Sequence, residues 1–251
     1  MPRTIKLTLA YDGHDFAGWQ VQPDRPTIQG TLVSAIEHLT GEKTLPQGSG
    51  RTDAGVHALA QVASLAIESP IPTANLRRAL NDVLPASIRV LNVEEVCADF
   101  HARKSARAKT YRYRIYRSEI CPPWLARYVY HHPYPLNEEA MIAAAQIVIG
   151  EHDFTSFAAV DPERRKEEME VSNVRTIYSS EWKREGEELI YTVRGSGFLH
   201  HMARNLAGTF LMIGKGSLDG GDLRRILAVR NRSAAAATAP ASGLFLVSVE
   251  Y

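Results

Sequence analysis

The first hundred residues alternate between two hydrophobic periods. Residues 4–11 alternate apolar and polar side chains, which is the two-residue period of a strand. Apolar residues then recur at helical spacing between Thr27, which introduces a helix, and Gly41, which closes it. Strands are expected next at 60–67 and 88–96, with a second helix between them at 75–84. The expected order in this half of the chain is therefore strand, helix, strand, helix, strand.

The second half repeats parts of this order. A strand is expected at 109–117, and Asn137 is a suitable N-cap for a helix over 138–149. Each half opens with a strand, has a long helix, and later has a Gly-Ser-Gly turn, at 48–50 and at 195–197. We therefore expect an α+β fold of two related α/β halves, 1–104 and 105–251, with mostly antiparallel sheets joined around a central cleft. Clefts between such halves are common ligand sites.

The C-terminal part of the second half contains further elements. The sequence favours a hairpin around residues 185–188, a helix from about 201 to 213 and a short helix over 222–229. Residues 233–241 are small and alanine-rich and are expected to form an ordered loop, and 243–251 a final strand. The charged run 161–168 is interpreted as a solvated loop or insert of unassigned role.

Composition excludes several classes of protein. The chain has 251 residues, of which 45% are apolar and 23% charged, and these are ordinary values for a globular protein. No apolar run reaches the ~18 residues of a membrane span, and no signal-peptide core follows Met1, so no membrane association is expected. Two cysteines, Cys97 and Cys121, are too few for a disulfide framework or a cysteine zinc site. A reducing cytoplasm is the expected location.

Local charge is more informative than the net charge of +1. The run from Arg103 to Arg117 contains no acidic residue, and tyrosines are interspersed with its basic residues. Such a run can hold phosphates and stack on bases, although a solvated strand face with tyrosines on the other side explains it equally well. The candidate RNA-binding residues are Arg103, Lys104, Arg107, Lys109, Arg112 and Arg114.

Residues 48–58 contain three glycines, an arginine, an aspartate and a histidine. Glycines allow positive φ and let another molecule come close to the backbone. Asp53, flanked by small residues, is placed to meet a ligand, but Asp and Gly are also ordinary turn formers. On composition alone both interpretations stay open.

The stretch Gly50-Arg51-Thr52-Asp53-Ala54-Gly55-Val56-His57-Ala58 resembles the signature of the TruA family of tRNA pseudouridine synthases, without a break over nine residues. Other motifs of the family follow in the expected order and extend the resemblance over essentially the whole chain. They are at 11–20, 27–30, 100–103, 109–113, 152–157, 198–204 and 243–246. The chain departs from the family pattern at Ala203 and at Ala241-Ser242, and neither change involves a charged catalytic group.

The resemblance implies the pseudouridine synthase fold and the isomerisation of uridine to pseudouridine at positions 38, 39 and 40 of the anticodon arm of tRNA. It also implies a homodimer and no cofactor or metal. The family's catalytic aspartate corresponds to Asp53, on the half 1–104. The residues that correspond to its substrate-binding positions are Tyr111, Arg204, Arg51 and Leu244.

Elementary chemistry is consistent with these roles. Exchanging a C–N glycosidic bond for a C–C bond requires a group that acts as nucleophile or base, and a carboxylate such as Asp53 can do either. Whether it attacks the base, attacks C1′ or removes a sugar proton stays open. Arg204 would hold the carboxylate by a charge-assisted bond. Tyr111 could stack on uracil and deprotonate C5.

The remaining residues leave alternatives. Arg51 could fill the space of a base turned out of its stack, or could simply contact a phosphate. The pairs at 131–132 and 200–201 suggest metal ligands, but adjacent residues on a helix do not share a face, so no metal site is expected. The rival functions are an RNA-binding module without catalysis and another base-flipping enzyme, such as a glycosylase.

Overall fold

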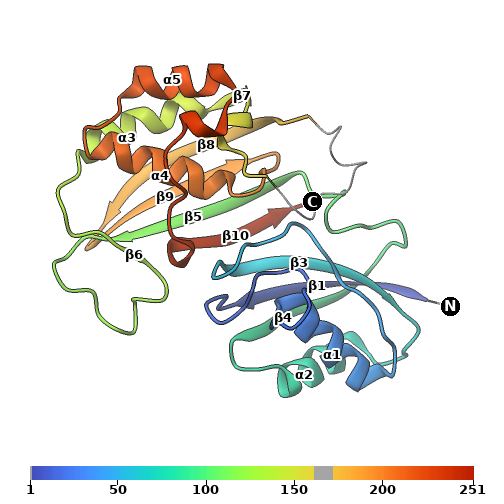
Figure 1. The fold of residues 1–251 in the computed structure, drawn as a ribbon. Coiled ribbons are helices and arrows are strands. Elements are labelled where there is room, and N and C mark those ends of the chain that lie inside the picture. The colour runs from blue at the N-terminus through green and yellow to red at the C-terminus, as the bar shows by residue number, and fades with distance from the viewer. Residues whose placement is uncertain (1, 161–171) are drawn as a thin grey trace. The chain divides into compact units, whose positions relative to one another are not determined.

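A computed structural model describes residues 2–160 and 172–251, so the charged run 161–168 lies outside the described residues. The chain divides into two compact units (Figure 1). Unit 1 runs to Arg107 and includes Phe245–Tyr251, and unit 2 is Ala108–Leu244. The division predicted from the sequence, 1–104 and 105–251, assigned the last strand to the second half, whereas Phe245–Tyr251 here belongs to unit 1. That division into domains stays a prediction.

Unit 1 is a mostly antiparallel sheet covered by two helices. Its strands follow the order β4-β1-β3-β10, with β1 antiparallel to both β3 and β4, and β2 pairs with β3. β10 is parallel to β3, with Phe245 opposite His57. The elements are β1 (Arg3–Tyr11), α1 (Ile28–Thr40), β2 (Gln47–Gly48), β3 (His57–Ile67), α2 (Thr73–Val83), β4 (Ile88–Val96) and β10 (Leu244–Glu250).

The core of unit 1 forms where the periodic apolar residues of sheet and helices meet. Ile5, Leu7 and Leu9 of β1 are buried, as the two-residue period predicts. Leu32 on α1 and Leu80 on α2 are also fully buried. α1 begins and ends where the sequence indicated, because the Thr27 side chain caps Gly30 N–H and Gly41 takes the left-handed conformation at φ 74°.

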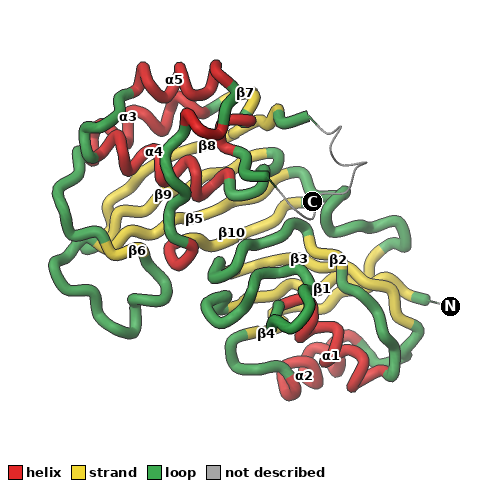
Figure 2. The backbone as a smooth tube through the Cα atoms, viewed as in Figure 1, coloured by secondary structure: helices red, strands yellow, loops and turns green. Residues whose placement is uncertain are grey.

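Unit 2 consists of mostly antiparallel strands with helices on one face (Figure 1 and Figure 2). Its strand order is β5-β9-β8-β7, and the short β6 pairs with β5 in parallel. The strands are β5 (Ala108–Tyr116), β6 (Tyr130–His131), β7 (Gly150–Asp153), β8 (Val174–Glu185) and β9 (Glu188–Gly195). The helices are α3 (Glu138–Ala145), α4 (Met202–Gly214) and α5 (Gly220–Val229), with 3-10 turns at Gln146–Val148, Thr155–Phe157, Arg232–Ala234 and Ala241–Gly243.

The core of unit 2 centres on α4, most of whose residues are buried. Phe210 of α4 meets Tyr191 of β9 at 5.1 Å between ring centroids, and Trp182 of β8 stacks on Tyr191 at 5.0 Å. Aromatic pairs at these separations stabilise a core beyond their buried area. The helix is thereby fixed against the sheet.

The structure confirms the α+β class and the mostly antiparallel sheets, with three local differences. The helix expected over 138–149 ends at Ala145 and continues as a 3-10 turn, which buries Val148 completely. The short strand β6 lies between the strand expected at 109–117 and α3, where the sequence indicated no element. α4 begins at Met202 rather than His201. Within the described ranges, no helix is both long enough and apolar enough to cross a membrane.

Candidate active site

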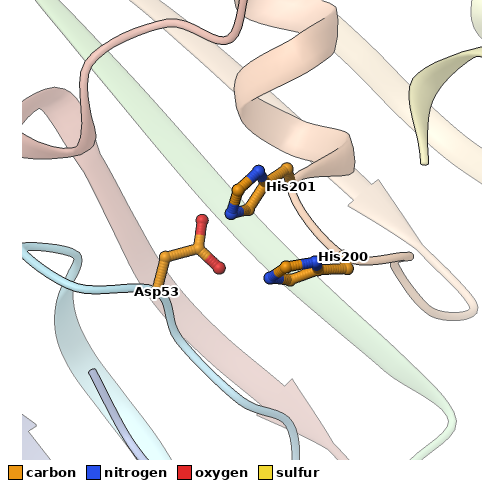
Figure 3. A group of neighbouring side chains, drawn as sticks. All are labelled: Asp53, His200 and His201. Atoms are coloured by element: carbon orange, nitrogen blue, oxygen red, sulfur yellow. The ribbon is translucent and has the colours of Figure 1, made fainter. Parts of the chain in front are cut away.

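Asp53 lies on the loop between β2 and β3, here called the Asp53 loop (residues 48–58; Figure 3). Its side chain is partly exposed, whereas Thr52 before it is buried and Arg51 is exposed. Val56 N–H donates to the Asp53 carbonyl at 3.1 Å and closes a tight turn in which Gly55 has φ 77°. The loop therefore leaves the carboxylate partly exposed, while Thr52 before it and Val56 after it are buried in unit 1.

A buried network of polar side chains holds the start of this loop. Tyr11 Oη and Thr52 Oγ1 are hydrogen-bonded at 2.8 Å, and Gln61 Nε2 donates to the Gly50 carbonyl at 2.9 Å. Ser49 Oγ in turn donates to Gln61 Oε1 at 2.7 Å. Burial raises the pKa of Tyr11 to about 12, although its bonds to Thr52 and Gln61 oppose the shift. The hydroxyl is thus kept protonated, and the backbone is fixed on both sides of Arg51.

The segment 13–19 packs against the other side of the loop. Trp19 N–H donates to the Thr52 carbonyl at 3.0 Å. A Cβ at Gly13 would lie 1.9 Å from the Val56 carbonyl oxygen, and one at Gly18 would lie 2.7 Å from the Thr52 carbonyl oxygen. Glycine is required at both positions because two backbones approach this closely.

His57 follows the loop and is 1% exposed. Its Nδ1 accepts from Gly13 N–H at 3.1 Å, and its ring stacks on Phe245 at 4.7 Å between centroids. These contacts give this histidine a structural role at the start of β3.

Tyr111 lies on β5 of unit 2 and is 7% exposed. The rings of Tyr111 and Phe198 pack edge to face, with 4.8 Å between their centroids. Tyr113 and Ile115 are buried like Tyr111, whereas the arginines between them are less buried. The tyrosines at 111 and 113 therefore point away from the face that carries the arginines, and they do not form one mixed surface with them.

Arg204 lies in the first turn of α4. Its Nε donates to the Ala239 carbonyl at 2.8 Å, and Ala239 N–H donates back to the Arg204 carbonyl at 3.2 Å. Tyr113 Oη donates to the Pro240 carbonyl at 2.9 Å. Burial raises the pKa of Tyr113, and the nearby Arg204 guanidinium partly opposes the rise. Leu244, the other substrate-binding candidate of unit 2, is the first residue of β10 and is 5% exposed.

His200 and His201 precede α4 (Figure 3). Their rings are 4.0 Å apart between centroids, and His201 has the left-handed φ of 59° at the N-cap. The two residues are therefore not neighbours on a helix, and the helical-face argument against a shared role for them is wrong. That the protein holds no metal stays a prediction.

The basic run divides between the two units. Arg103, Lys104 and Arg107 belong to unit 1, and each is exposed. The other three basic candidates, Lys109, Arg112 and Arg114, are on β5. Arg114 donates to both carboxylate oxygens of Glu188, at 2.7 and 2.6 Å, so its guanidinium is already engaged. The buried Nε of Arg112 has no hydrogen-bond partner in the described part of the chain.

Sequence reasoning identified the charged candidates but missed the residues that support them. Tyr11, Gln61 and Ser49 were unassigned, although a tyrosine, a glutamine and a serine buried in apolar strands need partners. The contact between Arg204 and the alanine-rich residues was also missed, because alanine and proline offer only backbone groups there.

An α+β fold with a supported aspartate loop fits the class of RNA-modifying isomerases, and comparison with known proteins specifies the family. The family model described as tRNA pseudouridine synthase matches residues 8–103 and 144–251. The chain belongs to this family of isomerases, as the resemblance at 50–58 indicated.

Two relatives illustrate the extent of the similarity. The tRNA pseudouridine synthase A of Solibacter usitatus is 55% identical over 249 residues, which cover 99% of this chain and 100% of the relative. That of Caldicellulosiruptor bescii is 44% identical with the same coverage. Among solved structures, a crystal structure of a Cbf5-Nop10-Gar1 complex aligns with a TM-score of 0.32 and 15% identity, over 82% of this chain and 54% of that one. That likeness is too distant to support an argument.

Proposed function

We propose that this protein is a tRNA pseudouridine synthase that acts on uridines 38, 39 and 40 of the anticodon stem-loop, with Asp53 as its nucleophile or base. The observation that carries the proposal is the unbroken signature at residues 50–58, which forms a loop with a partly exposed carboxylate between the buried Thr52 and Val56. The family and the names of the relatives support it.

The reaction rearranges one nucleotide without adding or removing an atom. The bond from C1′ to N1 of uracil breaks, the base rotates, and a bond from C1′ to C5 forms. C5 loses its hydrogen to solvent, and N1 gains a proton. Asp53 either bonds covalently to the substrate or removes a proton, and either role requires the ionised carboxylate to face the nucleotide.

Tyr111, Arg204, Arg51 and Leu244 are proposed to act on the same nucleotide. Tyr111 stacks on uracil and accepts the C5 proton, and Arg204 pairs with the Asp53 carboxylate and orients it. Leu244 offers an apolar contact to the base. Arg51, which is exposed on the Asp53 loop, fills the position of the flipped base or contacts a phosphate.

The wider assembly is also part of the proposal. The exposed Arg103, Lys104 and Arg107 contact the tRNA backbone, joined by Lys109, Arg112 and Arg114 of β5 to the extent that their present contacts allow. The protein works as a cytoplasmic homodimer and uses no cofactor or metal, because the rearrangement requires neither redox chemistry nor a transferred group.

Tritium release from tRNA labelled at uracil C5 tests the function. We expect release by the wild-type protein and a loss of about 10²–10⁴-fold or more in Asp53→Asn, since an amide cannot serve as nucleophile or base. Asp82→Asn, an exposed aspartate of α2, is the matched control and should retain activity. A wild-type protein that releases no tritium overturns the proposal.

Two further outcomes identify the rival functions. Equal release by wild type and Asp53→Asn would remove Asp53 from the chemistry. Chain scission by aniline after incubation would reveal an abasic site and therefore a glycosylase. Sequencing for pseudouridine in tRNA from cells with and without the gene then locates the modified positions.

A further inference from the structure

We infer that the alanine-rich segment (residues 233–241) positions Arg204 for catalysis, and that Thr238 is the side chain through which it does so. The inference rests on the proposed function, in which Arg204 pairs with the catalytic carboxylate. It assigns a role to a segment that has no part in the proposed function above. All of its contacts lie within unit 2.

The segment contacts the first two turns of α4. Arg204, Asn205 and Gly208 are at positions i, i+1 and i+4 of the helix, and each contacts the segment directly. A Cβ at Gly208 would lie 2.1 Å from the Ala237 carbonyl oxygen. The backbone of the segment therefore lies directly on the helix, in a space that only glycine leaves.

The buried side-chain amide of Asn205 fixes where the segment lies along the helix axis. Asn205 is 0% exposed, and its Nδ2 donates to the Phe157 carbonyl at 2.7 Å. Its Oδ1 then accepts from Thr238 Oγ1 at 2.7 Å and from Arg232 Nη2 at 3.0 Å. Because both ends of the amide are bonded, its orientation is determined, and Thr238 Oγ1, which also accepts from Arg232 Nη2 at 3.2 Å, is held by two hydrogen bonds.

Thr238 is adjacent in the chain to Ala239, whose carbonyl accepts from Arg204 Nε at 2.8 Å. The guanidinium is planar, so a bond at Nε fixes the plane and the direction of the two terminal nitrogens. Ala239 N–H also donates to the Arg204 carbonyl. A displaced Thr238 would move this carbonyl and rotate the guanidinium, without removing any atom of Arg204.

This positioning differs in its consequences from simple support of the fold. A structural role predicts lower stability with an unchanged reaction rate in the molecules that remain folded. Positioning predicts a lower kcat at nearly unchanged KM, since the tRNA contacts are intact and only the transition state is affected. It also predicts that the effect depends on the guanidinium of residue 204.

The test uses a matched set of threonine variants. Thr238→Val removes the hydroxyl but keeps the shape, and Thr238→Ser keeps the hydroxyl. Thr209→Val is the control, because Thr209 is fully buried on α4 and its Oγ1 donates to the Asn205 backbone carbonyl at 2.9 Å rather than to the segment. Tritium release at C5 gives kcat and KM, and thermal unfolding gives the stability of each variant.

We expect Thr238→Val to lower kcat by about 10-fold to 100-fold with KM changed less than about twofold. Thr238→Ser and Thr209→Val should retain the wild-type kcat. In an Arg204→Gln background, measured in single turnover with excess enzyme, Thr238→Val should have almost no further effect. An equal loss of kcat in both backgrounds, or an unchanged kcat in Thr238→Val, overturns the inference.

A spectroscopic readout keeps the inference testable where the double variant is too slow to measure. The Nε–H resonance of Arg204, assigned by its absence in Arg204→Gln, should be protected from exchange in wild type and in Thr209→Val. It should exchange rapidly in Thr238→Val, and an unchanged protection there overturns the inference. Failure of the proposed function is distinct, since the wild-type protein itself would then release no tritium.

Discussion

Two regions of the molecule hold a candidate active-site residue, and they do so by different means. In unit 1, polar side chains of β1 and β3 bond to the Asp53 loop on both sides of Arg51. In unit 2, a backbone carbonyl of the alanine-rich segment accepts from the Arg204 side chain. Each region also includes a glycine at which a backbone carbonyl approaches closely, Gly13 in the first and Gly208 in the second.

The difference reflects the groups being held. In unit 1 the network bonds to the Thr52 hydroxyl and the Gly50 carbonyl, so it acts on the chain that leads to Asp53. In unit 2 the Ala239 carbonyl accepts from the side chain of Arg204 itself. A guanidinium has five donors, so one can be fixed by the protein while others address a carboxylate.

Alanine substitution of the two glycines should give the largest effects. Gly13→Ala places a Cβ against the Val56 carbonyl, and we expect a loss of about 3 kcal/mol or more in the free energy of unfolding. Gly208→Ala meets the Ala237 carbonyl but gains about 1 kcal/mol of helix propensity, so its loss should be smaller. Denaturant unfolding measures both, and Gly41→Ala, which has open space around it but costs about 1–2 kcal/mol because its φ is 74°, is the control for backbone strain alone. Equal losses in all three variants would contradict the close-approach argument.

The buried Tyr11 hydroxyl of unit 1 should make the free energy of unfolding depend on alkaline pH. The pKa of Tyr11 is about 12 in the folded protein against about 10 when unfolded, so the unfolded state loses its proton first. Stability from this group is complete below pH 10 and is lost as pH rises towards 12. Tyr11→Phe should reduce that loss by roughly 2 kcal/mol, measured as the free energy of unfolding at pH 9 and 11.5. A pH dependence identical to wild type would show that Tyr11 is not protected.

The N-termini of helices α1 and α4 provide a third comparison. The N-cap of α1 is Thr27, with extended backbone and a side-chain hydrogen bond, whereas the N-cap of α4 is His201, with a φ of 59° and no side-chain cap. His201→Val should lose about 1–2 kcal/mol, because a branched side chain is strained there. His201→Asn should retain most of the stability, since asparagine adopts this conformation readily. Comparable losses in both variants would indicate that the ring, not the backbone, matters.

The smallest expected effect concerns tRNA binding. Arg107→Gln, which removes an exposed cation of unit 1, should reduce the slope of log affinity against log salt by about 1. Arg114→Gln should change the slope less, because Glu188 already engages that guanidinium. Filter binding at several salt concentrations measures the slopes. A larger change for Arg114 would mean that tRNA displaces Glu188.

The sequence predicted most of the fold because period and caps are local signals. Thr27, Gly41 and Asn137 are located at helix ends as expected. The early end of α3 was not predictable, because the 3-10 turn depends on how deeply Val148 enters the core, which is a tertiary effect. The pairing of β10 with β3 was not predictable either, because hydrophobic periodicity indicates a strand but not its partner.

The sequence predicted those parts of the candidate site that are formed by reactive side chains. It did not predict the parts that are formed by backbone groups. Asp53 was found from the motif at 50–58, and Tyr111 and Arg204 were found from the resemblance of 109–113 and 198–204 to the same family. Ala239 was not, since its contribution is a carbonyl group that every residue possesses. Whether Asp53, Tyr111 and Arg204 act on one nucleotide stays a prediction, which the variants above test.

The pairing of β10 with β3 has a consequence for biosynthesis. Unit 1 needs Phe245–Tyr251, yet the ribosome makes all of unit 2 before these residues. At about 5–20 residues per second, the edge of β3 waits on the order of ten to thirty seconds for its partner. During that interval the edge exposes unpaired backbone groups, and His57 lacks the ring of Phe245. The Asp53 loop is thus completed only late in translation, and a nascent chain stalled before residue 245 is a natural client for a chaperone.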